Sequence, residues 1–222
     1  MNPNSGLVFR NTTLRHAISG EPVNNTSATS VSDATETVFL LALEGSDVPD
    51  PRWGFWEKTI DSLVQIFQPS PVLTHVELFL PTKIKGGEVH FSTYFGRHAA
   101  WGSEFGNGKS FYFGHNETKW RAIPIMGTKA FENLRKECSA ESDAETPYSL
   151  PGYVFSVPPL RAFASTRHNG VGDPAHCAAL SARVLTRALP GLKLPYSDAW
   201  YGPSTLFIEL SKKVRMNTYN EY

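Results

Sequence analysis

Apolar and polar residues follow regular patterns along most of the chain, and these patterns predict its strands and helices. Residues 37–43 form a continuous apolar run, which is typical of a buried central strand. Residues 53–67 carry apolar side chains at helical spacing and stop before two prolines, so we expect an amphipathic helix there. Residues 74–80 and 88–95 alternate between apolar and polar side chains, and the Gly-Gly pair between them predicts a hairpin.

The middle of the chain predicts two more strands and one helix. We expect the strands at residues 110–113 and 119–125, and the helix at residues 128–138. Residues 147–169 are rich in proline and aromatic side chains without a clear period. This segment is expected to be mostly ordered loop, with room for one short helix or strand.

A strong helix is predicted around Cys177. Asp173 is suited to cap it and Pro174 to be its first residue, which places Cys177 in the first turn or just beyond it. The stripe that Cys177 begins continues at helical spacing with Leu180, Ser181, Val184, Leu185 and Ala188. A last short helix is expected at residues 205–212, with Ser204 as its cap. The pattern predicts an α+β fold in which an antiparallel sheet packs against the helix that carries Cys177.

The distribution of apolar residues also predicts the domain organisation. The chain has 222 residues, enough for one well-packed domain. Residues 1–35 are rich in Asn, Ser and Thr and have no sustained apolar period, so we expect a flexible N-terminal leader. The domain is expected to span residues 36–215 and to be followed by a short tail at residues 216–222.

Composition and charge exclude several classes of function. The 21 basic and 21 acidic residues give zero net charge, which argues against a nucleic-acid partner. The two cysteines, Cys138 and Cys177, are too few for a disulfide scaffold and favour a reducing compartment. No zinc-ligand spacing is found, and we expect no cofactor. No segment resembles a signal peptide or a transmembrane span, so a soluble, cytoplasmic protein is expected.

Cys177 and the histidines of the predicted hairpin are the candidate catalytic residues. A cysteine at a helix N-terminus is favoured as a thiolate, because free backbone N–H groups and the helix dipole stabilise an anion there. His75 and Glu77 share the polar face of one expected strand, and His90, Ser92 and Tyr94 share that of the next. A cysteine nucleophile needs an imidazole as its base and a third polar group that orients the imidazole.

The order of these residues resembles a known family. The segments Thr-His75-Val-Glu77-Leu, then His90, and much later His-Cys177-Ala-Ala-Leu are similar to the permuted branch of the NlpC-type papain-like superfamily. This branch includes lecithin:retinol acyltransferase-like enzymes, PPPDE-type isopeptidases and YiiX-like amidases. The resemblance implies a permuted papain-like fold with Cys177 as nucleophile, His75 as base and His90 as third residue. Many relatives have glycine at the position of Glu77.

The resemblance implies a cysteine hydrolase that cleaves a peptide, isopeptide or amide bond through a thioester intermediate. Its substrate would be a peptide, a ubiquitin-like tail or another acyl or amide compound. The alternatives are a lipid acyltransferase or thioesterase of the same fold, and a non-catalytic papain-like binding module. A metal-dependent hydrolase that uses His75, Glu77 and His90 is a further alternative.

Several assignments stay open at the level of sequence. The strand register could place Ser92 or Tyr94 opposite His75 in place of His90, and Glu77 lies two residues from His75 on the same face of its own strand. His176 lies about 100° around the helix from Cys177, so we expect it to have a structural role or to line the mouth of the cleft, and not to activate the sulfur. Cys138 falls on the apolar stripe of its helix and is expected to be a packing residue.

Overall fold

The structure is a computed structural model, and it describes residues 8–9, 38–44, 55–81, 88–94, 96–102, 120–126, 129–158, 160–163 and 170–219. In chain order, its strands and helices are β1 (Val8–Phe9), β2 (Val38–Glu44), α2 (Phe55–Ile66), β3 (Leu73–Pro81), β4 (Glu88–Ser92), β5 (Ala100–Trp101), β6 (Trp120–Met126), α3 (Ala130–Asp143), α4 (Leu150–Phe155), η3 (Leu160–Phe163), α5 (Cys177–Ala188), η4 (Asp198–Trp200) and α6 (Pro203–Tyr219).

The strands form a single sheet in the order β1-β6-β2-β3-β4-β5, and every pairing is antiparallel. β3 and β4 are the hairpin expected from the sequence, with Leu78 opposite Phe91 and Phe79 opposite His90. Because helices and an antiparallel sheet make up the described structure, the predicted α+β class is confirmed.

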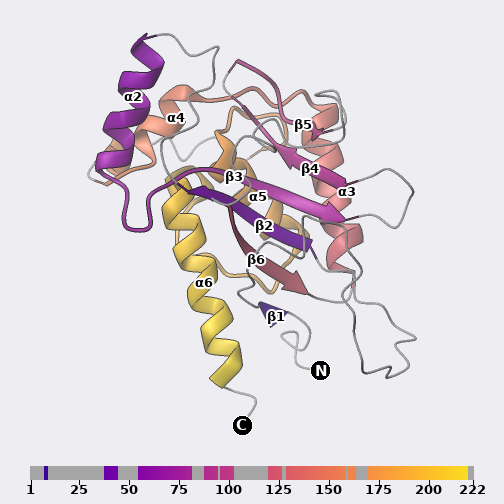
Figure 1. The fold of residues 1–222 in the computed structure, drawn as a ribbon. Coiled ribbons are helices and arrows are strands. Elements are labelled where there is room, and N and C mark those ends of the chain that lie inside the picture. Colours follow the sequence, from indigo (N-terminus) through magenta and orange to yellow (C-terminus); the bar gives the residue numbers. More distant parts are fainter. Residues whose placement is uncertain are drawn as a thin grey trace, which may run out of the picture.

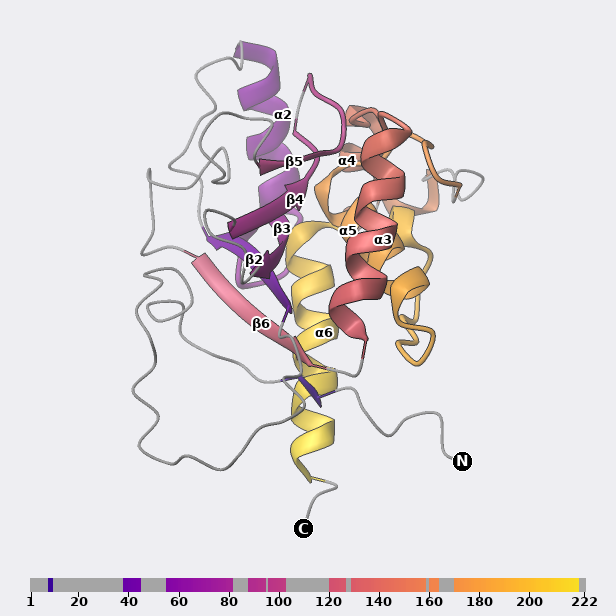
Figure 2. The same ribbon diagram turned by 90° about the vertical axis from the view of Figure 1, so that its right-hand side faces the viewer.

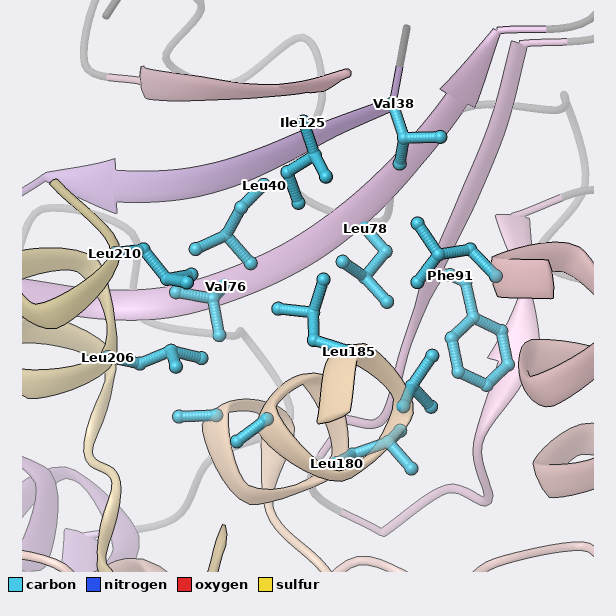
Figure 3. Close-up of a cluster of buried hydrophobic side chains, with 14 of the residues drawn as sticks. Val38, Leu40, Val76, Leu78, Phe91, Ile125, Leu180, Leu185, Leu206 and Leu210 are labelled. Atoms are coloured by element: carbon cyan, nitrogen blue, oxygen red, sulfur yellow. The ribbon is translucent and has the colours of Figure 1, made fainter. Parts of the chain in front are cut away.

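Helices α3, α5 and α6 lie together on one side of the sheet (Figures 1 and 2). The sheet face turned toward them is apolar, since Val76 and Leu78 of β3 belong to the buried core together with Leu180 and Leu185 of α5. Figure 3 shows these α5 side chains pointing at the sheet, with Leu206 of α6 beside Val76. The alternation predicted for β3 is thus confirmed, with its apolar residues on the helix side.

Helix α5 is buried almost all around. Every residue from Cys177 to Leu185 is buried, and the helix contacts β3, β4, α3, α6 and η4. A helix enclosed in this way is held chiefly by tertiary packing, and its position relative to the sheet is fixed on several sides. Cys177, at its first residue, therefore has a rigid support.

Helix α2 lies at one end of the sheet and packs against α4 (Figure 1). Val64 of α2 joins Tyr153 and Val157 in a small second core, and the Tyr153 hydroxyl donates to Asp61 of α2 at 2.7 Å. The other side of α2 is apolar and exposed. The large exposed side chains on this side are Phe55, Trp56, Leu63 and Ile66, and Phe67, the residue after the helix, is exposed as well.

Most predicted elements are found, with different ends. β4 stops at Ser92, α3 runs on to Asp143 and α6 runs on to Tyr219. The proline-rich segment 147–169 contains α4 and η3. Helix α4 begins where the Ser149 hydroxyl accepts a hydrogen bond from the Gly152 N–H at 3.0 Å, an ordinary N-terminal cap. The strand expected at residues 110–113 lies outside the described residues.

Two predicted helix starts are wrong. The residue that caps α5 is His176, so Asp173 and Pro174 precede the helix. Asp173 instead accepts a hydrogen bond from the backbone N–H of Gly170 at 2.6 Å. Ser204 lies inside α6, where its hydroxyl accepts from the Leu73 N–H at 2.8 Å and thereby ties α6 to the start of β3.

The predicted leader lies mostly outside the described residues. Within it, strand β1 forms the edge of the sheet and pairs with β6, with Val8 opposite Met126. The last residues of the predicted tail also lie outside the described part. No helix among the described residues is both long enough and apolar enough to cross a membrane.

Candidate active site

Cys177 is the first residue of α5, and its side chain is only 3% exposed. The first N–H groups of a helix have no partner within the helix and point out of its positive end. The sulfur therefore lies where a negative charge is stabilised. The packing of α5 against its neighbours holds it there, because a helix of this length is not stable alone.

His75 lies on β3 and makes a hydrogen bond with Cys177, from the sheet to the helix layer. Its strand partner is Leu43, and the register between β2 and β3 shifts directly after this pair, between Leu43 and Glu44. A shift of this kind bends a strand and re-aims its side chains. The irregularity lies beside His75, at the end of β3 where the next residue, Val76, packs into the core.

Glu77 is the residue that links the polar side chains of the hairpin. One carboxylate oxygen lies 3.2 Å from Nε2 of His75, and the other accepts a hydrogen bond from Nδ1 of His90 at 2.9 Å. The Tyr94 hydroxyl donates to the first of these oxygens at 2.6 Å. A carboxylate only accepts hydrogen bonds, so its charge favours a proton on Nε2 of His75 and on Nδ1 of His90.

Aromatic contacts fix the two imidazole rings. The His75 ring stacks on Tyr94 at a centroid distance of 4.8 Å, and the His90 ring lies against Phe79 at the same distance. Both histidines are buried, His75 at 6% and His90 at 1% exposure. The imidazole rings of His75 and His90 therefore have little freedom to change their orientation.

The structure thus brings Cys177, His75 and His90 into one cluster, and it places Glu77 between the two histidines. Of the side chains that the sequence left open as the third residue, Glu77 is the one whose carboxylate faces the His75 ring. The Ser92 hydroxyl donates to the backbone oxygen of Val76 at 2.9 Å. Tyr94 contributes a ring contact to His75 and a hydrogen bond to Glu77.

The electrostatics of the cluster favour a charged pair. Burial alone would raise the pKa of Cys177, but the charge of His75 and the nearness of the His75 and His176 rings outweigh it and lower the pKa to about 6. Burial likewise would lower the pKa of His75, but the charge of Cys177 and the contacts with Cys177 and Glu77 raise it to about 9. Hydrogen bonds to His75 and His90 hold the pKa of Glu77 well below its usual range against the effect of its burial. At neutral pH the stable form is a thiolate beside an imidazolium.

His176 is the N-terminal cap residue of α5 and is completely buried. Its ring lies against Tyr153 at a centroid distance of 5.7 Å, and neither ring nitrogen makes a hydrogen bond. Its burial agrees with the structural role expected from the sequence and not with a place at the mouth of a cleft.

Cys138 provides a contrast within the same protein. It is completely buried in the core, as expected for a packing residue. Burial and the charges of Glu141 and Glu137 raise its pKa well above the ordinary value. The two thiols of the chain therefore have pKa values shifted in opposite directions.

A metal centre has no support in the part of the chain that the structure describes. No group of three or more His, Cys, Asp or Glu side chains there is placed to hold a metal ion. Nε2 of His75 and Nδ1 of His90 instead lie against the two carboxylate oxygens of Glu77, so the charged partner of both histidines is this side chain.

Comparison with known proteins adds no relative. No protein-family model matches the chain, and no match is found among curated proteins or among solved structures. The resemblance to the permuted papain-like superfamily therefore stays a prediction that depends on the residues themselves.

Proposed function

We propose that this protein is a cysteine hydrolase of the permuted papain-like type, with Cys177 as nucleophile, His75 as base and Glu77 as the group that orients and charges the base. His90 is assigned to hold Glu77. The observation that supports this proposal most strongly is the contact of a thiol at a helix N-terminus with an imidazole whose far nitrogen faces a buried carboxylate.

The reaction proposed begins with attack of the Cys177 thiolate on the carbonyl carbon of a peptide, isopeptide or amide bond. The developing oxyanion accepts a hydrogen bond from the backbone N–H of Cys177, and a donor of this kind lowers a barrier by about 3 kcal/mol. The His75 imidazolium gives its proton to the leaving nitrogen, the C–N bond breaks and a thioester remains. Water then attacks the thioester carbonyl while His75 accepts its proton, and the C–S bond breaks. The carboxylic acid leaves, and the Cys177 thiolate beside the His75 imidazolium is restored.

Acyl transfer to Cys177 from an activated ester such as p-nitrophenyl acetate tests this proposal. Mass spectrometry should find one acetyl group on the peptide that contains Cys177, followed by its loss as water hydrolyses the thioester. His75→Ala should abolish the rapid acylation, and Cys138→Ala should retain it. Acylation that is absent at Cys177, or equally fast in His75→Ala, would overturn the catalytic assignment and favour a binding module.

Amide and peptide substrates test the bond class. Fluorogenic dipeptide amides and ubiquitin-like C-terminal amides should be turned over by the wild type and not by Cys177→Ala. If the enzyme acylates with the activated ester and cleaves no amide, the proposal of a peptidase or amidase is wrong and the acyl-transfer alternative replaces it.

One observation favours that second candidate, a lipid acyltransferase or thioesterase. The exposed apolar side of α2 includes Trp56 and Leu63, and Asp61 of the same helix bonds Tyr153, whose ring touches His176. Exposed apolar surfaces of this kind mark binding sites for apolar ligands or membranes. Faster deacylation of palmitoyl thioesters than of acetyl thioesters, with the preference weakened in Leu63→Ser, would support this candidate, and equal rates would exclude the role assigned to α2.

A further inference from the structure

Tyr94 makes two contacts with the candidate site. Its ring stacks on the imidazole of His75, with a centroid distance of 4.8 Å and an angle of 21° between the two planes. Its hydroxyl donates a hydrogen bond to Oε1 of Glu77 at 2.6 Å. The side chain is buried, so water does not compete for either contact. One residue therefore contacts both the proposed base and the carboxylate that faces it.

The chain holds Tyr94 in place through the turn that follows β4. The N–H of Arg97 donates to the Tyr94 carbonyl at 2.9 Å, and Gly96 has a φ of 70°. A positive φ of this size suits glycine, because a Cβ there would strain the backbone. Two residues before Tyr94, the Ser92 hydroxyl donates to the Val76 carbonyl of β3 at 2.9 Å. The backbone is thus fixed on both sides of Tyr94, and the ring has a defined position.

The Tyr94 hydroxyl and the His75 imidazole share one oxygen of Glu77. Nε2 of His75 lies 3.2 Å from Oε1, whereas the hydroxyl oxygen lies 2.6 Å from the same atom. An O–H group that bonds a carboxylate at about 2.5–2.7 Å makes a strong, charge-assisted hydrogen bond. The other carboxylate oxygen, Oε2, accepts from Nδ1 of His90 at 2.9 Å. Part of the negative charge that faces His75 is therefore taken up by Tyr94.

This sharing bears on the strength of His75 as a base. The pKa of His75 is raised to about 9 against the effect of burial, first by the charge of Cys177 and then by Glu77. An imidazolium that holds its proton too firmly is a poor general acid toward a leaving nitrogen. A donor that takes up part of the carboxylate charge makes this proton easier to release.

We propose that Tyr94 is a positioning residue that sets the base strength of His75, by holding Oε1 of Glu77 and taking up part of its charge. The inference rests on the proposed function, because the strength of the base matters only where His75 must return its proton. The titratable groups that the structure places around His75 are Glu77 on the same strand, Cys177 of α5 and Tyr94, with His90 of β4 on the far side of Glu77. Its strand partner on β2 is the apolar Leu43.

An NMR titration measures the pKa of His75 directly, in protein labelled with carbon-13 at the Cε1 atoms of histidine. His75→Ala identifies the signal. Tyr94→Phe keeps a ring against His75 and removes the hydroxyl, so the charge on Oε1 is left to the imidazolium. The midpoint of His75 should therefore move to higher pH by about 0.5–1 pH unit, which is part of the effect of a hydrogen bond to a charged group. A variant that merely loosened Glu77 would move the midpoint to lower pH.

Two matched variants serve as controls. In a Glu77→Gln background the charge is already absent, so the addition of Tyr94→Phe should not raise the midpoint. Tyr201→Phe removes the hydroxyl of another buried tyrosine, one that accepts from the Tyr196 N–H at 3.1 Å, and should leave the midpoint of His75 at its wild-type value. Thermal unfolding of each variant reports whether it folds.

A measurement on the wild type makes the test independent of the variants. When His75 loses its proton, the Tyr94 hydroxyl should donate more strongly to Oε1, because the competing charge has gone. In protein labelled with carbon-13 at tyrosine Cζ, at least one of the eight tyrosine signals should therefore shift with the midpoint of His75. If no tyrosine signal follows that midpoint, the inference is wrong even where Tyr94→Phe does not fold.

The outcomes distinguish this inference from the proposed function. A midpoint that stays in place or falls in a folded Tyr94→Phe variant would refute the role of Tyr94 alone, and so would an equal rise in the Glu77→Gln background. Acylation that is absent at Cys177 would refute the catalytic assignment, while a rise of the midpoint in Tyr94→Phe would still support the sharing of the Glu77 charge.

Discussion

Replacement of Glu77 by glutamine removes the negative charge that His75 and His90 share and leaves almost the same shape. The carboxylate lies 3.2 Å from His75 and 2.9 Å from His90 and is completely buried, so solvent does not screen its charge. A hydrogen bond to a charged group contributes about 1.5–3 kcal/mol, and each 1.36 kcal/mol corresponds to about one pKa unit. We expect the pKa of His75 to fall from about 9 by about one to two pH units.

The loss of this charge should also affect the thiol. An imidazolium that is harder to form stabilises the neighbouring thiolate less, so the pKa of Cys177 should rise from about 6. In wild type, alkylation of Cys177 should therefore show two steps, near pH 6 as the ion pair forms and near pH 9 as the imidazolium loses its proton. These are macroscopic values of the pair. In Glu77→Gln the lower step should move to higher pH and the upper step to lower pH. The pH range between the two steps should therefore become narrower.

Peptide mass spectrometry of iodoacetamide-treated protein, sampled across pH, measures both steps. Ser92→Ala is the matched control, because Ser92 is a buried polar residue of the same hairpin that bonds the Val76 carbonyl and not Glu77. Its profile should equal that of the wild type. If both steps stay in place in Glu77→Gln, the carboxylate does not charge His75 and our reasoning is wrong. If only the lower step moves, Glu77 acts on the thiol by a route other than His75.

Three further predictions concern the rest of the molecule. Cys138 should resist iodoacetamide up to pH 9 and react only on unfolding, because burial raises its pKa; rapid labelling in native protein would contradict its place in the core. Glu141→Gln should lower the free energy of unfolding by about 3–5 kcal/mol in urea denaturation, since it leaves the buried guanidinium of Arg183, 2.9 Å away, without its counter-charge. Lys212→Met, which breaks a half-exposed pair, is its control and should cost at most about 1 kcal/mol. Leu185→Ala should cost about 2–5 kcal/mol at a completely buried position, and a cost below about 1 kcal/mol would mean that α5 is not central to the core.

The sheet and the central helices were predictable because periodicity depends on burial. In β3 the alternation of Val76, Leu78 and Leu80 with polar neighbours follows from a sheet with one face in the core. In α5 the helical spacing of apolar residues predicted the contact with that face. The α+β class therefore follows from the sequence alone, whereas the permuted papain-like arrangement stays a proposal.

Element ends and caps were predicted less well because they depend on distant partners. Asp173 has the chemistry of a cap, but its carboxylate closes the turn at Gly170 and the helix starts at Cys177. Ser204 bonds the N–H of Leu73, a residue far away in the chain. A polar side chain that bonds a distant residue does not cap the helix next to it. The sequence does not show which of these two hydrogen bonds the side chain makes.

The candidate site was predictable in its members but not in its connections. The sequence identified Cys177, His75 and His90, and it left the choice of the third residue to the strand register. The pairing of Phe79 with His90 puts Glu77 within reach of both histidines. The complete burial of His176 could not be derived from its angle around a helix, because His176 precedes the first helical turn and has extended backbone geometry.

The chain order of the site has a consequence for the protein during its synthesis. His75, Glu77, His90 and Tyr94 belong to one hairpin region that leaves the ribosome well before α5 exists. Until α5 is made and docks on the sheet, the proposed base has no nucleophile beside it, and a newly made Cys177 has the ordinary pKa of a thiol. The proposed reactive thiolate is thus a property of the completed fold, and a stalled or truncated chain that lacks α5 is not expected to acylate itself or to capture an electrophile at this site.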